Sequence, residues 1–143
     1  MATLRVEIVT PEAPLWVGEA TALVARSTEG WFTVLPEHMD MVGDVVPSVV
    51  RVGTAEGEIA IAVHGGFFQV GPGEVGDETL ATVLAGIAEK VDEIDVARAQ
   101  AAKEAAQAEI AADSRNEPET TESVMARAAL ERAELRLNAA QAR

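Results

Sequence analysis

The chain has 143 residues and a mass of 15.0 kDa, enough for one ordinary domain or for a small domain with an appendage. It contains no cysteine, which excludes disulfide bonds and thiolate metal sites. The formal net charge of −13 disfavours nucleic-acid binding and adsorption to anionic lipid, because such a surface repels phosphate groups.

The N-terminal residues, MATLRVEIVT, lack the basic start, long apolar middle and small-residue cleavage site of a signal peptide. No apolar run approaches the length of a membrane span. We therefore expect a cytoplasmic protein without direct membrane insertion, which reaches a membrane only through a partner protein.

Residues 1–88 have the pattern of many short strands. Apolar residues alternate with their neighbours along residues 4–9 and again along residues 59–64, and each run gives one buried face. Glycines and prolines separate these runs, as turns do in antiparallel proteins. The pattern predicts an antiparallel sandwich or barrel, and a segment of this length can bury about 60% of its unfolded surface.

Aromatic and sulfur-containing side chains gather between residues 31 and 41. Phe32 is expected in the core, whereas Trp31, Met39 and Met41 beside His38 have the composition of a protein interface around one turn. For Trp31 and the two methionines, the sequence is equally compatible with a position in the core and a position at an interface.

The stretch GPGEVG at residues 71–76 matches the glycine spacing of a dinucleotide-binding loop. Such a site also needs a helix to begin there, but Asp77, Glu78 and a strand-like run follow instead. We interpret the stretch as a glycine-rich hairpin loop. No nucleophile motif, metal-ligand cluster or other catalytic constellation accompanies it.

The last third of the chain predicts two helices. Residues 92–112 contain neither glycine nor proline and are rich in alanine, the polar stretch DSRNEPETTES follows at residues 113–123, and helix formers resume at residues 124–143. Apolar residues of the second helix fall at steps of three and four, from Ala126 through Leu130, Ala133 and Leu137 to Ala140. An alanine-rich hairpin should open more easily than the strand domain.

Asp95 and Arg98 lie three residues apart in IDVARA, residues 94–99. Their spacing permits an intrahelical ion pair, and it favours this pair over a contact with a ligand. Asp95 is also close to the helix start, where the dipole and capping favour an acid.

Arg132 and Arg136 share a face of the second helix and have no acidic residue three or four positions away. Their charge should be neutralised from outside that helix. Acids of the first helix, such as Asp95, Glu104 or Glu109, are favoured as partners. The alternative is a bound anion such as a phosphate, which arginine side chains suit well.

Four blocks, taken in order, resemble the epsilon subunit of F-type ATP synthases along nearly the whole chain. The blocks are VEIVTPEAPLWVGEAT, STEGWFTVLPEHMDMV, IAVHGGFFQV and IDVARA. The resemblance implies an N-terminal antiparallel β-sandwich over residues 1–90, which binds the gamma subunit and the c-ring. It implies a C-terminal two-helix antiparallel hairpin over residues 91–143, which acts as a mobile regulatory tail.

The resemblance also implies which residues serve partners and ligands. The nucleotide contacts of bacterial relatives carry over to Glu89, Ile94, Asp95, Arg98, Arg132 and Arg136. ATP would be a regulatory ligand and no cofactor is required. Ala105 stands where some relatives carry an arginine, which weakens the expectation of ATP binding. We expect partner contacts at Trp31, His38, Met39 and Met41.

The implied function is that of a non-catalytic central-stalk subunit. It couples proton transport to ATP synthesis, restrains ATP hydrolysis through its helices, and reaches the alpha and beta subunits when the tail is extended. It would be peripheral on the cytoplasmic face of the bacterial cell membrane. The alternatives are a free-standing β-sandwich adaptor with a helical interaction tail, and an enzyme built on GPGEVG.

Overall fold

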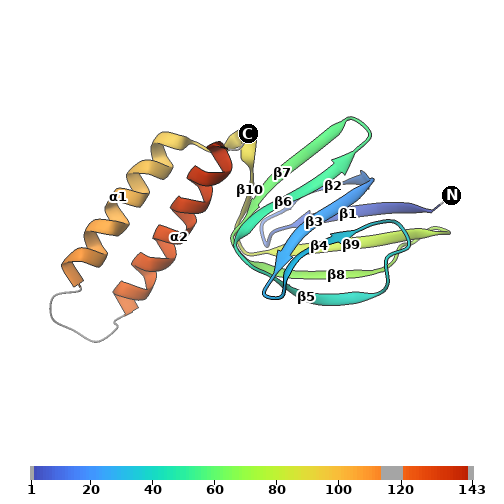
Figure 1. The fold of residues 1–143 in the computed structure, drawn as a ribbon, viewed down its shortest axis with the longest axis horizontal. Coiled ribbons are helices and arrows are strands. Elements are labelled where there is room, and N and C mark those ends of the chain that lie inside the picture. Colours follow the sequence, from blue (N-terminus) through green and yellow to red (C-terminus); the bar gives the residue numbers. More distant parts are fainter. Residues whose placement is uncertain (1, 114–120, 142–143) are drawn as a thin grey trace. The chain divides into compact units, whose positions relative to one another are not determined.

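The computed structural model of the chain describes residues 2–113 and 121–141 (Figure 1). These residues belong to two compact units, residues 1–90 and 91–143. The first unit consists of strands and the second of helices. Neither helix of the described part is long and apolar enough to cross a membrane.

The first unit contains ten strands, and most of them follow the alternating runs of the sequence. The strands are β1 Thr3–Val9, β2 Pro14–Ala20, β3 Ala22–Ser27, β4 Gly30–Val34, β5 Met41–Val45, β6 Ser48–Thr54, β7 Gly57–Val63, β8 Gly66–Pro72, β9 Glu78–Ala85 and β10 Ala88–Lys90.

The strands form two five-stranded sheets, which face each other as a sandwich (Figure 1). The first sheet, sheet A, has the order β2-β1-β9-β8-β5, and the second, sheet B, has the order β10-β7-β6-β3-β4. The predicted antiparallel β-sandwich is confirmed, with one exception. The strands β1 and β9 pair in parallel, with Leu4 opposite Thr79 and Ile8 opposite Val83. Local alternation could not reveal this pair because its strands are far apart in the sequence.

One apolar core lies between the two sheets. Large side chains from both sheets fill it with essentially no exposure, among them Leu4, Ile8, Leu23, Ile61 and Val83. Phe32 packs against this core, as expected, and its ring lies 4.4 Å from that of Phe68, centroid to centroid, at an interplanar angle of 34°. Full burial of side chains of this size stabilises a fold by about 1.5–3 kcal/mol each.

The second unit is a short 3₁₀ turn, η1 Val91–Glu93, followed by the helices α1 Val96–Asp113 and α2 Thr121–Gln141. The two helices contact each other and run antiparallel (Figure 1). The predicted two-helix hairpin is therefore confirmed, although α1 begins four residues later than the sequence pattern suggested and α2 begins three residues earlier. Most of the predicted connection at residues 113–123 lies outside the described residues.

Alanine dominates the buried positions of the hairpin. Ala99 and Ala106 of α1 and Ala126 and Ala133 of α2 are buried, and the other predicted stripe positions, Leu130, Leu137 and Ala140, are half-buried. An alanine contact brings helices close but removes little apolar surface from water, so the hairpin interface is weaker per residue than the sandwich core.

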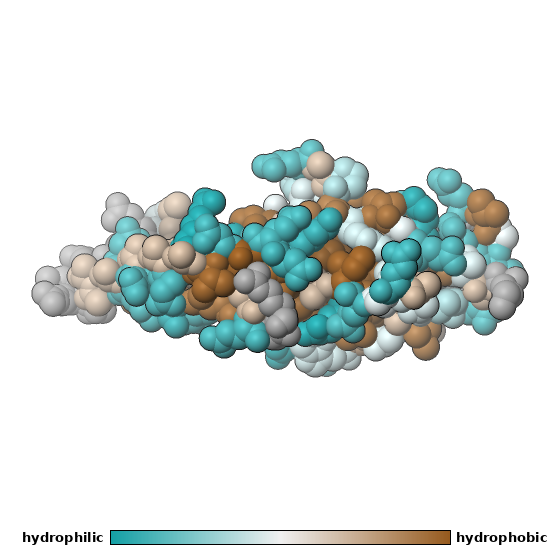
Figure 2. Space-filling view, turned by 90° about the horizontal axis from the view of Figure 1, so that it is seen from above, coloured by the Kyte–Doolittle hydropathy of each residue, from teal (hydrophilic) through white to brown (hydrophobic). Residues whose placement is uncertain are grey.

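The surface carries both hydrophilic and apolar residues. Hydrophilic side chains cover most of the face seen in Figure 2, and apolar residues show between them.

Candidate functional site

Asp95 caps the first long helix. Its Oδ1 atom accepts a hydrogen bond of 3.0 Å from the backbone N–H of Arg98, the third residue of α1. This is the N-cap geometry that satisfies one of the free amides at a helix start. The predicted intrahelical ion pair is wrong, because no ion pair joins the two side chains in the described part of the chain. The capping alternative is confirmed, and Arg98 itself is exposed.

Arg132 and Arg136 are half-buried on α2. Arg136 has interaction partners of its own within residues 2–113 and 121–141. Glu104 accepts a hydrogen bond of 3.2 Å from Gln100 on its own helix. The favoured expectation, neutralisation of the two arginines by acids of the first helix, stays a prediction. Binding of an anion by the arginines stays a prediction.

Most of the candidate nucleotide residues lie in the helical unit. Ile94 is buried just before α1, and its amide donates to the carbonyl of Val91 at 3.3 Å. Because the helices run antiparallel, the start of α1 lies beside the last turns of α2 (Figure 1), and η1 also contacts α2. Ile94, Asp95 and Arg98 are thus at the end of the hairpin toward which Arg136 lies, and Arg132 is one turn further along.

Glu89 belongs to the other unit. It lies in β10, opposite Ala62 of β7, and its carboxylate is 3.4 Å from Nε2 of His64. The sequence analysis missed His64 as a partner of Glu89, because 25 residues separate the two and no local pattern links them. A nucleotide role for Glu89 stays a prediction.

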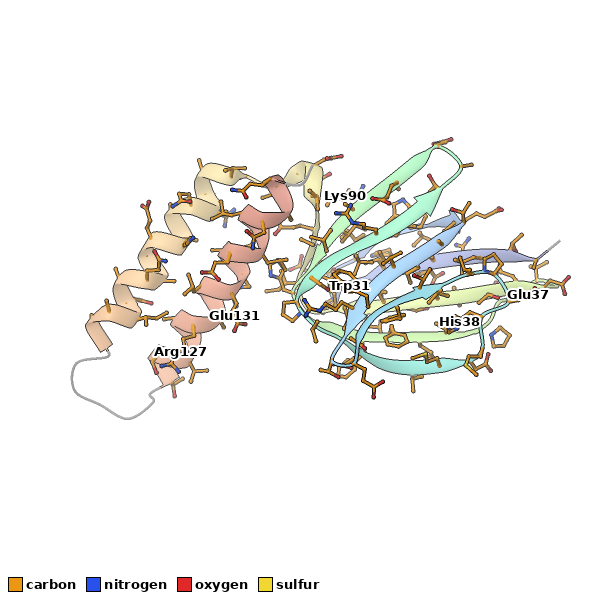
Figure 3. The ribbon with its side chains drawn as sticks, viewed as in Figure 1. Trp31, Glu37, His38, Lys90, Arg127 and Glu131 are labelled. Carbon is orange, nitrogen blue, oxygen red and sulfur yellow. The ribbon has the colours of Figure 1, made fainter. Side chains whose placement is uncertain are left out.

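Three of the four predicted interface residues are exposed, and the four do not surround one turn. Trp31 is 58% exposed and Met39 is 73% exposed, and Met41 is also exposed. The strand β4 carries the chain from Trp31 to Val34, so that Trp31 lies well apart from His38 (Figure 3). The Arg26 guanidinium lies 5.8 Å from the Trp31 ring centroid, and His38 is half-buried with Nδ1 2.7 Å from the carbonyl of Met39.

A second exposed apolar surface, which the sequence analysis missed, lies on the outer face of sheet A. Phe67 of β8 is 66% exposed and lies opposite Leu84 of β9, which is 50% exposed. Val42 of β5 is 73% exposed on the same face. The two adjacent phenylalanines of GFFQV carried the signal, because neighbouring strand residues face opposite sides and one of the two rings must point outward.

The glycine-rich stretch is a hairpin connection, as predicted. The strands β8 and β9 pair antiparallel around it, with Pro72 opposite Thr79, and the Gly73 amide donates to the Glu78 carbonyl at 2.7 Å. No helix begins there, so the amides do not form a phosphate site.

A pocket of 270 Å³ beside this connection is lined by Glu37, His38, Asp40, Gly71, Pro72, Gly76, Asp77, Glu78 and Thr79. No three histidine, aspartate or glutamate side chains in the described residues are arranged to hold a metal ion.

Comparison with known proteins accounts for both units. The model of the ATP synthase delta/epsilon chain β-sandwich domain matches residues 3–91, and the model of the long α-helix domain of the same chain matches residues 92–141. The chain belongs to the ATP synthase delta/epsilon family. The delta/epsilon subunits of this family are accessory and non-catalytic, so the resemblance seen in the sequence is confirmed and the enzyme alternative is excluded.

Individual relatives of this delta/epsilon chain agree with the family match. An ATP synthase epsilon chain of Moorella thermoacetica is 38% identical over 143 residues, covering 99% of each chain. An ATP synthase epsilon chain of Thermobifida fusca is 44% identical over 113 residues, covering 77% of this chain and 79% of that one. A chain in the mitochondrial ATP synthase of Euglena gracilis shares the fold, with a TM-score of 0.75, 24% identity, and coverage of 99% of this chain and 82% of that chain.

Proposed function

We propose that this delta/epsilon chain is a rotor subunit of the central stalk of a bacterial F-type ATP synthase, and that its helical unit restrains ATP hydrolysis. The proposal is supported by the contrast between its two units. The sandwich buries large side chains such as Leu4, Ile8 and Ile61, whereas the hairpin buries mainly alanines. A stiff unit can transmit torque, and a weakly packed one can change conformation at small energetic cost.

The sandwich would hold the subunit in the stalk by protein contact. The apolar outer face of sheet A, with Val42, Phe67 and Leu84, offers a surface for the gamma subunit. The exposed Trp31, and Met39 and Met41 beside His38, offer separate surfaces for gamma or the c-ring. Exposed aromatic and methionine side chains are typical of interface centres. The chain would thereby be held peripherally at the cytoplasmic face of the membrane and take part in proton-coupled ATP synthesis.

The hairpin would act as the regulatory element. In its extended form it would reach the alpha and beta subunits and obstruct rotation in the direction of hydrolysis. A nucleotide bound to the folded hairpin would oppose this extension, since a ligand shifts a conformational equilibrium by its differential affinity for the two states. Arg132 and Arg136, which are half-buried on the same face of α2, would contact the phosphates, and Ile94, Asp95 and Arg98 would complete the site.

The regulatory role is tested by truncation. ATP hydrolysis is measured in the assembled synthase with the full-length chain and with a chain that ends after Val91. We expect a higher hydrolysis rate with the truncated chain because the obstructing element is removed. Equal subunit content and equal proton pumping per ATP in the two preparations serve as the control. An unchanged hydrolysis rate in a fully assembled complex would show that the helices do not restrain the motor.

The nucleotide role is tested by calorimetric titration of ATP into the full chain. The Arg132→Ala/Arg136→Ala variant should bind at least about tenfold more weakly, since each charge-assisted hydrogen bond contributes about 1.5–3 kcal/mol. The matched control is Arg26→Ala/Arg51→Ala, which removes the same charge from the sandwich. If wild-type protein binds no ATP, or if both double variants bind as wild type does, the nucleotide part of the proposal fails.

A further inference from the structure

The last strand of the sandwich is short and lies at an edge. The strand β10 has three residues and pairs within sheet B only with the end of β7, through Ala88 opposite Val63, Glu89 opposite Ala62 and Lys90 opposite Ile61. All three β10 side chains are only half-buried. Three paired residues at a sheet edge supply few hydrogen bonds and little burial, and such segments open at low free energy.

His64 reaches this strand in two ways. It follows β7 directly, and its backbone N–H donates to the carbonyl of Ile87 at 3.0 Å, one residue before β10 begins. Its imidazole, with a side chain only 3% exposed, lies with Nε2 3.4 Å from Oε1 of Glu89, whose side chain is 28% exposed. The next residue, Gly65, has a φ of +98°, a conformation that side chains rarely adopt, so the chain bends directly after His64.

We propose that His64 and Glu89 form a clasp that fastens β10 to β7, so that motion of the helical unit begins after Lys90 and does not peel the sandwich open. The use of this clasp to the protein depends on the proposed regulatory role of the helical unit. Its physical basis is within the sandwich: a proton on Nε2 donates to the carboxylate across the strand pair, and the buried ring cannot easily leave its position. His64 is a positioning residue for the strand, and the chain around it folds on the core side chains of β7.

Amide hydrogen exchange on the full chain tests the clasp. In the His64→Leu variant, the amides of residues 88–90 should exchange about three- to tenfold faster, as expected for the loss of one side-chain hydrogen bond. His64→Gln retains an N–H donor at a similar reach and should stay within about twofold of wild type. The amides of Val52 and Ile59, in the middle of the β6–β7 pair, serve as an internal reference for global opening.

A double-variant cycle separates the clasp from a general structural role. In a Glu89→Gln background, His64→Leu should have a smaller effect on the exchange of residues 88–90 than it has in wild type, because its partner has lost the carboxylate. The clasp is refuted if His64→Leu leaves β10 unchanged, if it accelerates Val52 and Ile59 equally, or if the two substitutions are additive. These outcomes are independent of the hydrolysis assay, so failure of the regulatory role and failure of the clasp are distinguishable.

Discussion

At the scale of single residues, Glu37 adopts a backbone conformation that its neighbours in the sequence do not predict. Glu37 has a φ of +70°, and it is the one non-glycine residue with a positive φ in the described part of the chain. Its amide donates to Oγ1 of the buried Thr79 at 2.9 Å, a contact that fixes the turn between β4 and β5. Asp95 has two candidate roles, because its carboxylate caps a helix and is also a candidate ligand of a nucleotide.

Replacement of Glu37 by glycine should stabilise the sandwich. The left-handed conformation costs a non-glycine residue about 1–2 kcal/mol, and glycine loses roughly 0.5–1 kcal/mol through the greater entropy of its unfolded state. We expect the free energy of unfolding to rise by about 0.5–1 kcal/mol in urea titrations of Glu37→Gly. Glu37→Ala, which keeps the strained φ, is the control and should not show this gain. A loss of stability in Glu37→Gly would contradict the strain argument.

Two substitutions of Asp95 should separate its capping role from its proposed ligand role. Asn is as good an N-cap as Asp, whereas Ala lacks the acceptor and costs about 1 kcal/mol of helix stability. Asp95→Asn should therefore keep the helix content of the wild type in thermal circular dichroism, and Asp95→Ala should lower the stability of the hairpin. Weaker ATP binding by Asp95→Asn would show that the negative charge of the Asp95 carboxylate contributes to ligand binding. Equal destabilisation by both substitutions would refute the cap.

At the scale of elements, the register of neighbouring strands decides which residues tolerate change. Gly66 opens β8 opposite Ala85 of β9, and a Cβ atom at this position would overlap the carbonyl oxygen of Leu84. Gly71, near the other end of the same strand, has no atom within 4 Å of such a Cβ. One strand thus holds a glycine fixed by a close backbone approach and a glycine with open space.

Substitution of these two glycines by alanine should give different results. Gly66→Ala forces the β8 and β9 backbones apart, and overpacking of this kind costs about 1–3 kcal/mol or more. Gly71→Ala should change the free energy of unfolding by less than about 0.5 kcal/mol, as surface substitutions usually do. Both values come from urea denaturation of the full chain. Similar values for the two variants would mean that the β8–β9 contact relaxes freely.

At the scale of the whole molecule, the two units differ in what holds them together. The sandwich closes one core between two five-stranded sheets, while the two helices contact each other mainly through alanine. Stability is therefore expected to be uneven along the chain, and the less stable part is the one that the proposed regulation requires to move.

Amide exchange should reveal this difference directly. Core amides such as those of Leu23, Ile61 and Val83 should exchange only through global opening of the sandwich. Amides in the middle of α1 and α2 should exchange at least about tenfold faster, because a smaller apolar surface opposes their opening. Measurement by mass spectrometry or NMR at one pH and temperature suffices. Equal protection of both units would indicate one cooperative block and would remove the basis for an independently moving hairpin.

Much of this organisation could be predicted from local patterns. The alternation along residues 4–9 and 59–64 identified β1 and β7, the alanine-rich stretches identified both helices, and Asp95 was recognised as an acid at a helix start. Each of these signals depends on residues within one turn or one strand of each other, and short-range sterics and hydrogen bonding decide the outcome.

The sequence by itself determined the fold class, a β-sandwich followed by a helical hairpin. The periodicities of strands and helices depend only on residues that are close together in the sequence. Only the tertiary structure decided the parallel pairing of β1 with β9, the separation of Trp31 from His38, the outward position of Phe67 beside Leu84, and the approach of His64 to Glu89. The physical reason is the same in each case. These arrangements depend on how strands distant along the chain pair and pack, and closing of the core fixes that packing through contacts that a local pattern does not specify.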